Sequence, residues 1–231
     1  PATARLMRRV DFVFKYFPVE LPPSPSIPSA AAAKPRIVHA PNHRHVKGTE
    51  FLLDAAGKLG IEVILVEGVP RPEALEIYRS ADIVADQFCI GAFGVFALEA
   101  LALGKPVLTY LDREHLATPA LNLPIVNTTP ENLAEVLAAL SAVPDLRTRL
   151  GVAGRAAVER YHSPSAIGEA WARIYRHVWW GEPLALETTR HFSPERGTRA
   201  LSEDPLDEEF WPVFVGDLMP RIAEAVRLMS S

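Results

Sequence analysis

A short helix between two apolar segments most constrains what this chain can fold into. Residues 97–103 are strong helix formers, and Gly104 stands where a left-handed residue would end the helix. The apolar segments 81–86 and 106–110 on either side predict buried strands. The stretch is therefore expected to be a β-α-β crossover whose helix begins near Gly94.

The N-terminal end of this helix is expected to face the carboxyl edge of a sheet. Open α/β sheets bind ligands at that edge, and a helix N-terminus with free N–H groups and a small residue such as Gly94 lets a phosphate approach the backbone. A glycine that only makes a tight turn, with Glu99 as a solvated helix residue, explains the same pattern.

The strand and helix signals alternate along most of the chain. The segment 41–47 is a polar, basic loop in this interpretation, and Thr129 is the expected N-cap of a helix. The alternation predicts an α/β, Rossmann-like, doubly wound parallel sheet with helices on both faces over residues 34–180. Strands are expected at 36–40, 62–66, 81–86, 106–110 and 124–126, and helices at 48–59, 72–79, 94–103, 130–140, 147–161 and after Ser163.

The two ends of the chain have a different composition. Residues 1–33 are interpreted as the remnant of a preceding domain followed by a Pro/Ala-rich linker. Residues 181–231 are expected to form an extended arm that ends in an amphipathic helix over 210–229, and residues 112–115 form a polar loop. The sequence thus divides into segments 1–33, 34–180 and 181–231.

Composition excludes several classes of protein. The net charge of −4 and the pI of about 6.0 give no electrostatic footprint for nucleic acid. A single cysteine, Cys89, cannot form an internal disulfide, and no apolar run is long enough to span a membrane. We therefore expect a cytoplasmic protein whose membrane association is peripheral at most.

The histidines do not have the spacing of metal ligands. His39, His43 and His45 lie close together in the sequence, but without a cysteine or aspartate partner nearby. No metal site is expected.

Three segments together resemble the C-terminal, donor-binding domain of GT-B-fold glycosyltransferases, in particular the family-4-type retaining group. They are residues 39–50, 77–82 and 93–107. The last segment is the most specific, because it joins Phe93-Gly94, a helix glutamate and Gly104-Lys105-Pro106-Val107 on one crossover. The resemblance extends over residues 34–180.

The resemblance implies a nucleotide diphosphate sugar as donor, an acceptor of unknown identity and no cofactor. Arg44 and Lys47 would act as catalytic residues by neutralising the diphosphate leaving group, although a solvated basic loop has the same composition. Glu99 would accept hydrogen bonds from the ribose hydroxyls. Further nucleotide contacts would come from Gly68, Val69, Gly94, Val95 and Phe96.

The sequence departs from the family pattern in two places. Gly91 stands where the family carries a glutamate close to the transferred sugar. Asp86 and Gln87, just upstream, are candidates to contact the sugar, or they only end the strand. The acceptor-binding domain, N-terminal in the family, is absent from this sequence, so the chain is expected to act as part of a two-domain enzyme.

Three functions are compatible with these features. The first is the donor-binding half of a hexosyltransferase-type enzyme that acts with retention. The second is a non-catalytic nucleotide-binding or scaffolding domain of the same fold, which Gly91 and the absent half both favour. The third is a nucleotide-sugar epimerase, for which His43, His45 and Asp86 are the available acid and base residues.

Overall fold

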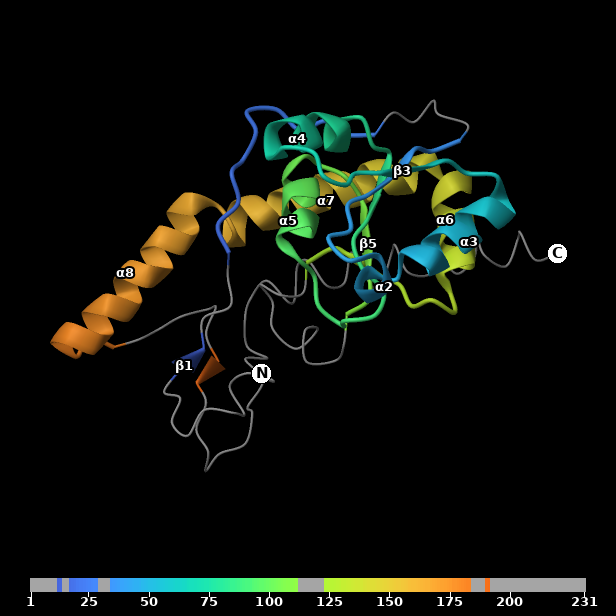
Figure 1. The fold of residues 1–231 in the computed structure, drawn as a ribbon. Helices are drawn as coiled ribbons and strands as arrows, with labels where there is room; N and C mark the ends of the chain where they lie inside the picture. The colour runs from blue at the N-terminus through green and yellow to red at the C-terminus, as the bar shows by residue number, and fades with distance from the viewer. Residues whose placement is uncertain (1–11, 14–16, 29–33, 112–122, 184–189, 192–231) are drawn as a thin grey trace.

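The computed structural model describes residues 12–13, 17–28, 34–111, 123–183 and 190–191 (Figure 1). The expected loop at 112–115 and the expected helix at 210–229 lie outside these residues.

The core of the described chain is a five-stranded parallel sheet with the strand order β3-β2-β4-β5-β6. The strands are short and consist mainly of Val, Ile and Leu, which is typical of a sheet covered on both faces. His39 pairs with Leu65 on one side and with Ala85 on the other, so these three strands end at the same level. The strands are β2 (Ile37–His39), β3 (Val63–Leu65), β4 (Ile83–Ala85), β5 (Val107–Thr109) and β6 (Val126–Asn127).

Helices cover both faces of this sheet (Figure 1). One hydrophobic cluster joins the sheet to α3 and α6, and a second joins it to α4, α5 and the C-terminal half of α7. The prediction of a doubly wound α/β sheet is therefore confirmed. The helices are α2 (Arg44–Lys47), α3 (Thr49–Leu59), α4 (Arg71–Arg79), α5 (Val95–Ala102), α6 (Leu133–Ala142), α7 (Pro144–Tyr161) and α8 (Pro164–Trp180).

Two glycines let α7 pack closely against α5 and the turn that follows it. A Cβ atom at Gly151 would lie 2.0 Å from the carbonyl oxygen of Gly104, and one at Gly154 would lie 2.5 Å from Cδ2 of Leu101. Gly104 has a φ of 76° and ends α5 as the sequence predicts. At these two glycines α7 therefore lies closer to the Gly104 backbone and to the Leu101 side chain than a residue with a Cβ atom would allow.

Four local predictions were wrong. The segment 41–47 is not all loop: residues 44–47 form one helical turn, because the left-handed Gly48 donates its N–H to the carbonyl of Arg44. The N-cap of α6 is Asn132 rather than Thr129, since the side-chain oxygen of Asn132 accepts the N–H of Thr129 and closes a turn before the helix. The last strand and α7 are also displaced: the strand lies at 126–127 and α7 begins at Pro144.

The segment 17–28 lies along the α/β unit. Val19 is buried and donates its N–H to the carbonyl of His162 at 2.9 Å, and the N–H of Ser26 donates to Leu103 at 2.7 Å. A two-residue strand, β1 (Phe12–Val13), pairs antiparallel with β7 (Arg190–His191). The division at residues 33 and 180 stays a prediction.

The helix after Ser163 begins as predicted, because the Ser163 hydroxyl accepts the N–H of Ala166 at 3.2 Å. Among the helices that the structure describes, none has the length and apolar character needed to cross a membrane.

Candidate functional site

The candidate site lies at the carboxyl ends of β2 and β4. After β2 the chain forms β3, which lies on one side of β2, and then β4, which lies on its other side. The strand order therefore reverses between β2 and β4. Ligands of open α/β sheets bind at such a switch point. Here the segment after β2 supplies Lys47, and the segment after β4 supplies Asp86 and the start of α5.

Asp86 joins the parts of this site. Its carboxylate is fully buried; Oδ1 accepts a hydrogen bond from Nζ of Lys47, and Oδ2 accepts the backbone N–H of Gly94 at 2.8 Å. The Lys47 side chain is 12% exposed, and its carbonyl accepts the N–H of Phe88 at 3.0 Å. One carboxylate thus fixes the ammonium and the N-terminal end of α5 relative to each other.

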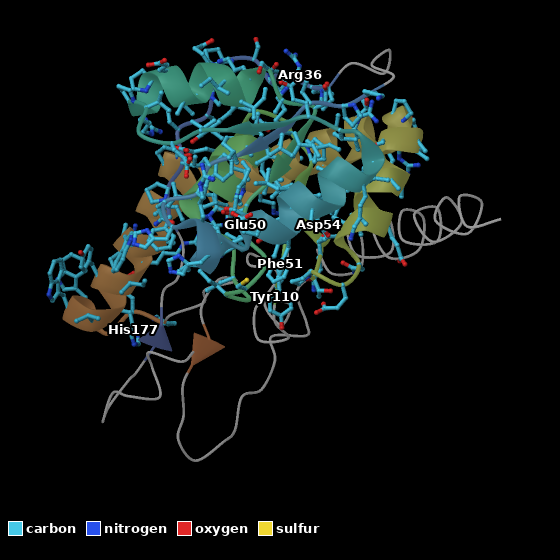
Figure 2. The ribbon with its side chains drawn as sticks, turned by 45° about the vertical axis from the view of Figure 1, so that its right-hand side comes forward. Arg36, Glu50, Phe51, Asp54, Tyr110 and His177 are labelled. Atoms are coloured by element: carbon cyan, nitrogen blue, oxygen red, sulfur yellow. The ribbon has the colours of Figure 1, made fainter. Side chains whose placement is uncertain are left out.

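Gly48, which ends the one-turn helix α2, is closely surrounded by other side chains. A Cβ atom at Gly48 would lie 3.1 Å from Sγ of Cys89 and 3.3 Å from the ring of Phe51, and the φ of Gly48 is 74°. Phe51 is exposed on α3, as are Glu50 and Asp54, which are labelled with it in Figure 2. The glycine therefore lets the chain turn sharply between Lys47 and α3.

Arg44 and Lys47 have different partners. Arg44 forms a two-point ion pair with Glu67, with Nε to Oε1 at 2.9 Å and Nη2 to Oε2 at 2.5 Å. This contact lowers the pKa of the Glu67 carboxyl and raises that of the guanidinium. Both side chains are exposed, so the pair contributes little to stability.

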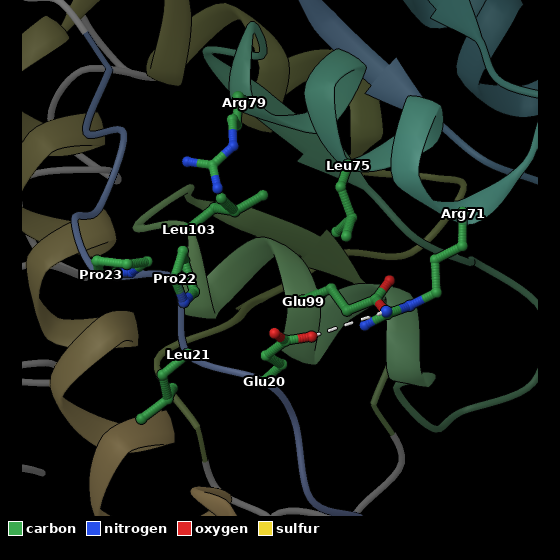
Figure 3. A pocket seen from close by; sticks show the side chains of 9 residues that line it. All are labelled: Glu20, Leu21, Pro22, Pro23, Arg71, Leu75, Arg79, Glu99 and Leu103. Atoms are coloured by element: carbon green, nitrogen blue, oxygen red, sulfur yellow. Dashed lines mark hydrogen bonds and ion pairs between the residues drawn. The ribbon is translucent and has the colours of Figure 1, made fainter.

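Glu99 projects from α5 one turn after its start. Its side chain is 11% exposed, and Oε1 accepts a hydrogen bond from Nε of Arg71 at 2.8 Å. Figure 3 shows both residues at a pocket of about 160 Å³ between α4, α5 and the segment 20–23. The other residues that line it are Glu20, Leu21, Pro22, Pro23, Leu75, Arg79 and Leu103.

Some of the N–H groups at the start of α5 donate hydrogen bonds within the protein, and two have no acceptor among the described residues. Gly94 donates to Asp86, and Ala97 donates back to the carbonyl of Gly94 at 3.1 Å. No group of the described residues accepts from the N–H of Val95 or Phe96. These two donors and the positive end of the helix dipole can therefore bind an anion.

A buried histidine anchors the carboxyl end of β2. The Nδ1 atom of His39 lies 2.8 Å from the carbonyl oxygen of Ala85, and Nε2 lies 2.8 Å from the hydroxyl of Thr49. Burial lowers the pKa of His39, so the ring is neutral and donates from Nδ1 to the carbonyl while Nε2 accepts from the hydroxyl. His39 thereby connects β2 to β4 and to the first residue of α3.

The residues predicted to contact base and sugar lie in the loops at the same edge. Gly68, with a φ of 68°, and Val69 connect β3 to α4. Gly91 is buried with a φ of 77°, a conformation that glycine adopts without strain and a glutamate does not. Gln87 is buried, and its side-chain Oε1 has no hydrogen-bond partner in the described chain. The predicted sugar contacts of Asp86, Gln87 and Gly91 stay predictions.

Sequence reasoning missed three charged or polar residues of this site: His39, Glu67 and Arg71. His39 is the last residue of its strand, and Glu67 follows the next strand at the same edge, which is the positional signal that could have marked them. Arg71 pairs with a residue 28 positions away, so no local pattern marks it.

The comparisons with known proteins return glycosyltransferases. No family model matches the chain. In sequence, the chain is 31% identical over 149 residues to D-inositol 3-phosphate glycosyltransferase of Frankia alni, a match that covers 62% of this chain and 36% of that protein.

Solved structures of low sequence identity share the fold. TarM of S. aureus, a variant solved in complex with fondaparinux, alpha-GlcNAc-glycerol and UDP, matches with a TM-score of 0.57 at 13% identity, over 75% of this chain and 41% of TarM. Sucrose-phosphate synthase of Thermosynechococcus elongatus matches with a TM-score of 0.50 at 18% identity, over 72% of this chain and 50% of that one. The chain is thus similar to glycosyltransferases of GT-B-like fold and spans half or less of the length of each.

Proposed function

We propose that this chain is the donor-binding half of a retaining glycosyltransferase of the hexosyltransferase type, which transfers a sugar from a nucleotide diphosphate sugar. The observation that carries the proposal is the meeting of Lys47, the N-terminus of α5 and Glu99 at the switch point of the sheet. The similarity to D-inositol 3-phosphate glycosyltransferase supports the reaction class.

The diphosphate would bind between Lys47 and α5. The ammonium of Lys47 has further N–H groups beside the one given to Asp86, and the N–H groups of Val95 and Phe96 point out of the helix start. As the bond to the sugar breaks, negative charge grows on the leaving diphosphate, and these fixed donors stabilise it. Arg44 would add a second cation when a phosphate takes the place of the Glu67 carboxylate on its guanidinium.

Glu99 would bind the ribose. Arg71 holds Oε1, and Oε2 has no partner among the described side chains, so it can accept from a ribose hydroxyl. Gly68 and Val69 would lie against the base, and the sugar would lie toward Asp86, Gln87 and Gly91. The acceptor-binding part would precede this chain in a longer, cytoplasmic enzyme.

A non-catalytic nucleotide-binding domain is the second candidate. The left-handed backbone of Gly91 favours it, because the glutamate that the family places there would strain this loop. Epimerase chemistry is less well supported: His43 and His45 are exposed, and both carboxylate oxygens of Asp86 are engaged.

Titration calorimetry with UDP, ADP and GDP tests the donor site. We expect one of them to bind, and Glu99→Gln to weaken it by roughly 10- to 100-fold, since the ribose loses a charge-assisted hydrogen bond. Glu135→Gln on the exposed side of α6 is the matched control and should bind as the parent does.

Equal affinity of the Glu99→Gln variant and the parent would remove Glu99 from the site. A turnover assay on a chain extended by an acceptor-binding domain separates the two candidates. Nucleotide binding without turnover there would favour the non-catalytic domain.

A further inference from the structure

The Asp86 carboxylate is fully buried, and the proposed transfer of the sugar assigns it no chemical role. Its two oxygens accept from the Lys47 ammonium and from the first N–H of the α5 start, at Gly94. The proposed function assigns the same ammonium and the same helix end to the donor diphosphate. The carboxylate of Asp86 therefore shares its cation and its helix dipole with the substrate.

We propose that Asp86 is a charge-balancing residue that limits the affinity of the site for the nucleoside diphosphate and so speeds release of this product after sugar transfer. The inference rests on the proposed function, because it concerns the anion that Lys47 and α5 bind.

Lys47 and Asp86 carry opposite charges. Lys47 carries one positive charge and Asp86 one negative charge, so the pair is neutral before any ligand binds. A diphosphate on Val95 and Phe96 must share Lys47 with a carboxylate that is hydrogen-bonded to the adjacent residue, Gly94. Like charges at such short range repel, and the repulsion is weakly screened because Asp86 is removed from water.

The repulsion acts on the product as well as on the donor. A nucleoside diphosphate carries more negative charge on its terminal phosphate than the same phosphate esterified to a sugar. Asp86 therefore destabilises the bound product more than the bound donor, which favours release over retention of the product.

Replacing the Asp86 carboxylate by a neutral amide distinguishes charge balancing from a role in holding Lys47 in position. In Asp86→Asn the side-chain oxygen can still accept the N–H of Gly94, while the amide N–H groups offer nothing to Lys47. The ammonium is then free to pair fully with a phosphate. If Asp86 only held Lys47 in position, the same change would weaken phosphate binding instead.

Strand β4 offers a matched control at its other end. Asp82 is also a buried aspartate, and its Oδ2 accepts the N–H of Arg36 at 2.9 Å. It precedes the strand at the amino edge, whereas Asp86 follows the strand at the carboxyl edge. Asp82→Asn changes the net charge by the same amount, so it controls for general electrostatic effects.

The experiment measures the binding of inorganic pyrophosphate and of UDP, ADP and GDP by titration calorimetry, with thermal unfolding as a check of folding. We expect Asp86→Asn to bind both pyrophosphate and the preferred nucleotide about tenfold more tightly, which is ~1.4 kcal/mol. Asp82→Asn should match the parent. Stopped-flow release of the nucleotide should slow by a similar factor in Asp86→Asn.

Unchanged or weaker binding in a folded Asp86→Asn variant overturns the inference. Where that variant does not fold, Asp86→Ser, whose hydroxyl oxygen can accept from Gly94, is subject to the same criterion. Pyrophosphate has no ribose, so its binding does not depend on Glu99. Tighter pyrophosphate binding without nucleotide binding would contradict the proposed function and the release of a nucleoside diphosphate, while the charge balance between Asp86 and Lys47 would stand. Nucleotide binding with no change in Asp86→Asn would contradict the inference alone.

Discussion

The close contact between α7 and the end of α5 predicts that a larger residue at position 151 destabilises the fold. In Gly151→Ala the new Cβ would lie 2.0 Å from the carbonyl oxygen of Gly104. The obstacle is backbone, so α7 must move away from the turn that ends α5. Overpacking of this kind costs about 1 to 3 kcal/mol, and the higher helix propensity of alanine returns up to about 1 kcal/mol.

We therefore expect Gly151→Ala to lower the free energy of unfolding by about 2 kcal/mol, or the melting midpoint by about 4 to 8 °C. Gly168→Ala is the control, because a Cβ at this exposed position of α8 meets nothing within 4 Å. It should raise the free energy of unfolding by up to about 1 kcal/mol. Urea unfolding followed by circular dichroism measures both values. Equal stability of the two variants would refute the close packing of α7 on the α5 turn.

Two buried bases predict how stability depends on pH. Because burial lowers the pKa of His39, the unfolded chain takes up a proton below pH 6.5 that the folded chain resists, so the free energy of unfolding falls as the pH drops below 6.5. In His39→Gln this fall should be shallower, and identical slopes between pH 5 and about 7 would exclude His39 as a cause. Lys105 is buried beside Ser26, and this burial lowers the pKa of its ammonium to about 8. Because the folded chain then releases this proton at lower pH than the unfolded chain does, the free energy of unfolding should rise by about 3 kcal/mol between pH 8 and 10.5. Unfolding of Lys105→Met over that window should lack this rise, and a rise as large as in the parent would count against the assignment.

Local signals in the sequence were sufficient for the central crossover. Helix formers followed by Gly104 and a proline predicted where α5 ends, and alternating apolar segments predicted the parallel sheet. They were not sufficient where the deciding contact is distant in sequence. Asp86 meets Lys47 across 39 positions, and Gly151 meets Gly104 across 47, so neither contact leaves a local pattern.

Competition between alternative local structures explains the wrong predictions at α6 and α2. At the start of α6 several residues could cap the helix, and the sequence offered no means to rank Thr129 below Asn132. Propensity alone did not distinguish a polar loop from the single turn of α2, which depends on the left-handed Gly48.

The central claim is that Lys47 stabilises the leaving diphosphate, and donor saturation curves test it most directly. In an enzyme that includes the acceptor-binding part, Lys47→Ala should lower kcat by roughly 10²- to 10³-fold, the usual effect of removing one electrostatic stabiliser, while KM changes much less. Lys58→Ala, which removes an exposed lysine of α3, should leave both constants unchanged. A large rise in KM with kcat intact would show that Lys47 only holds the donor and would contradict the claim.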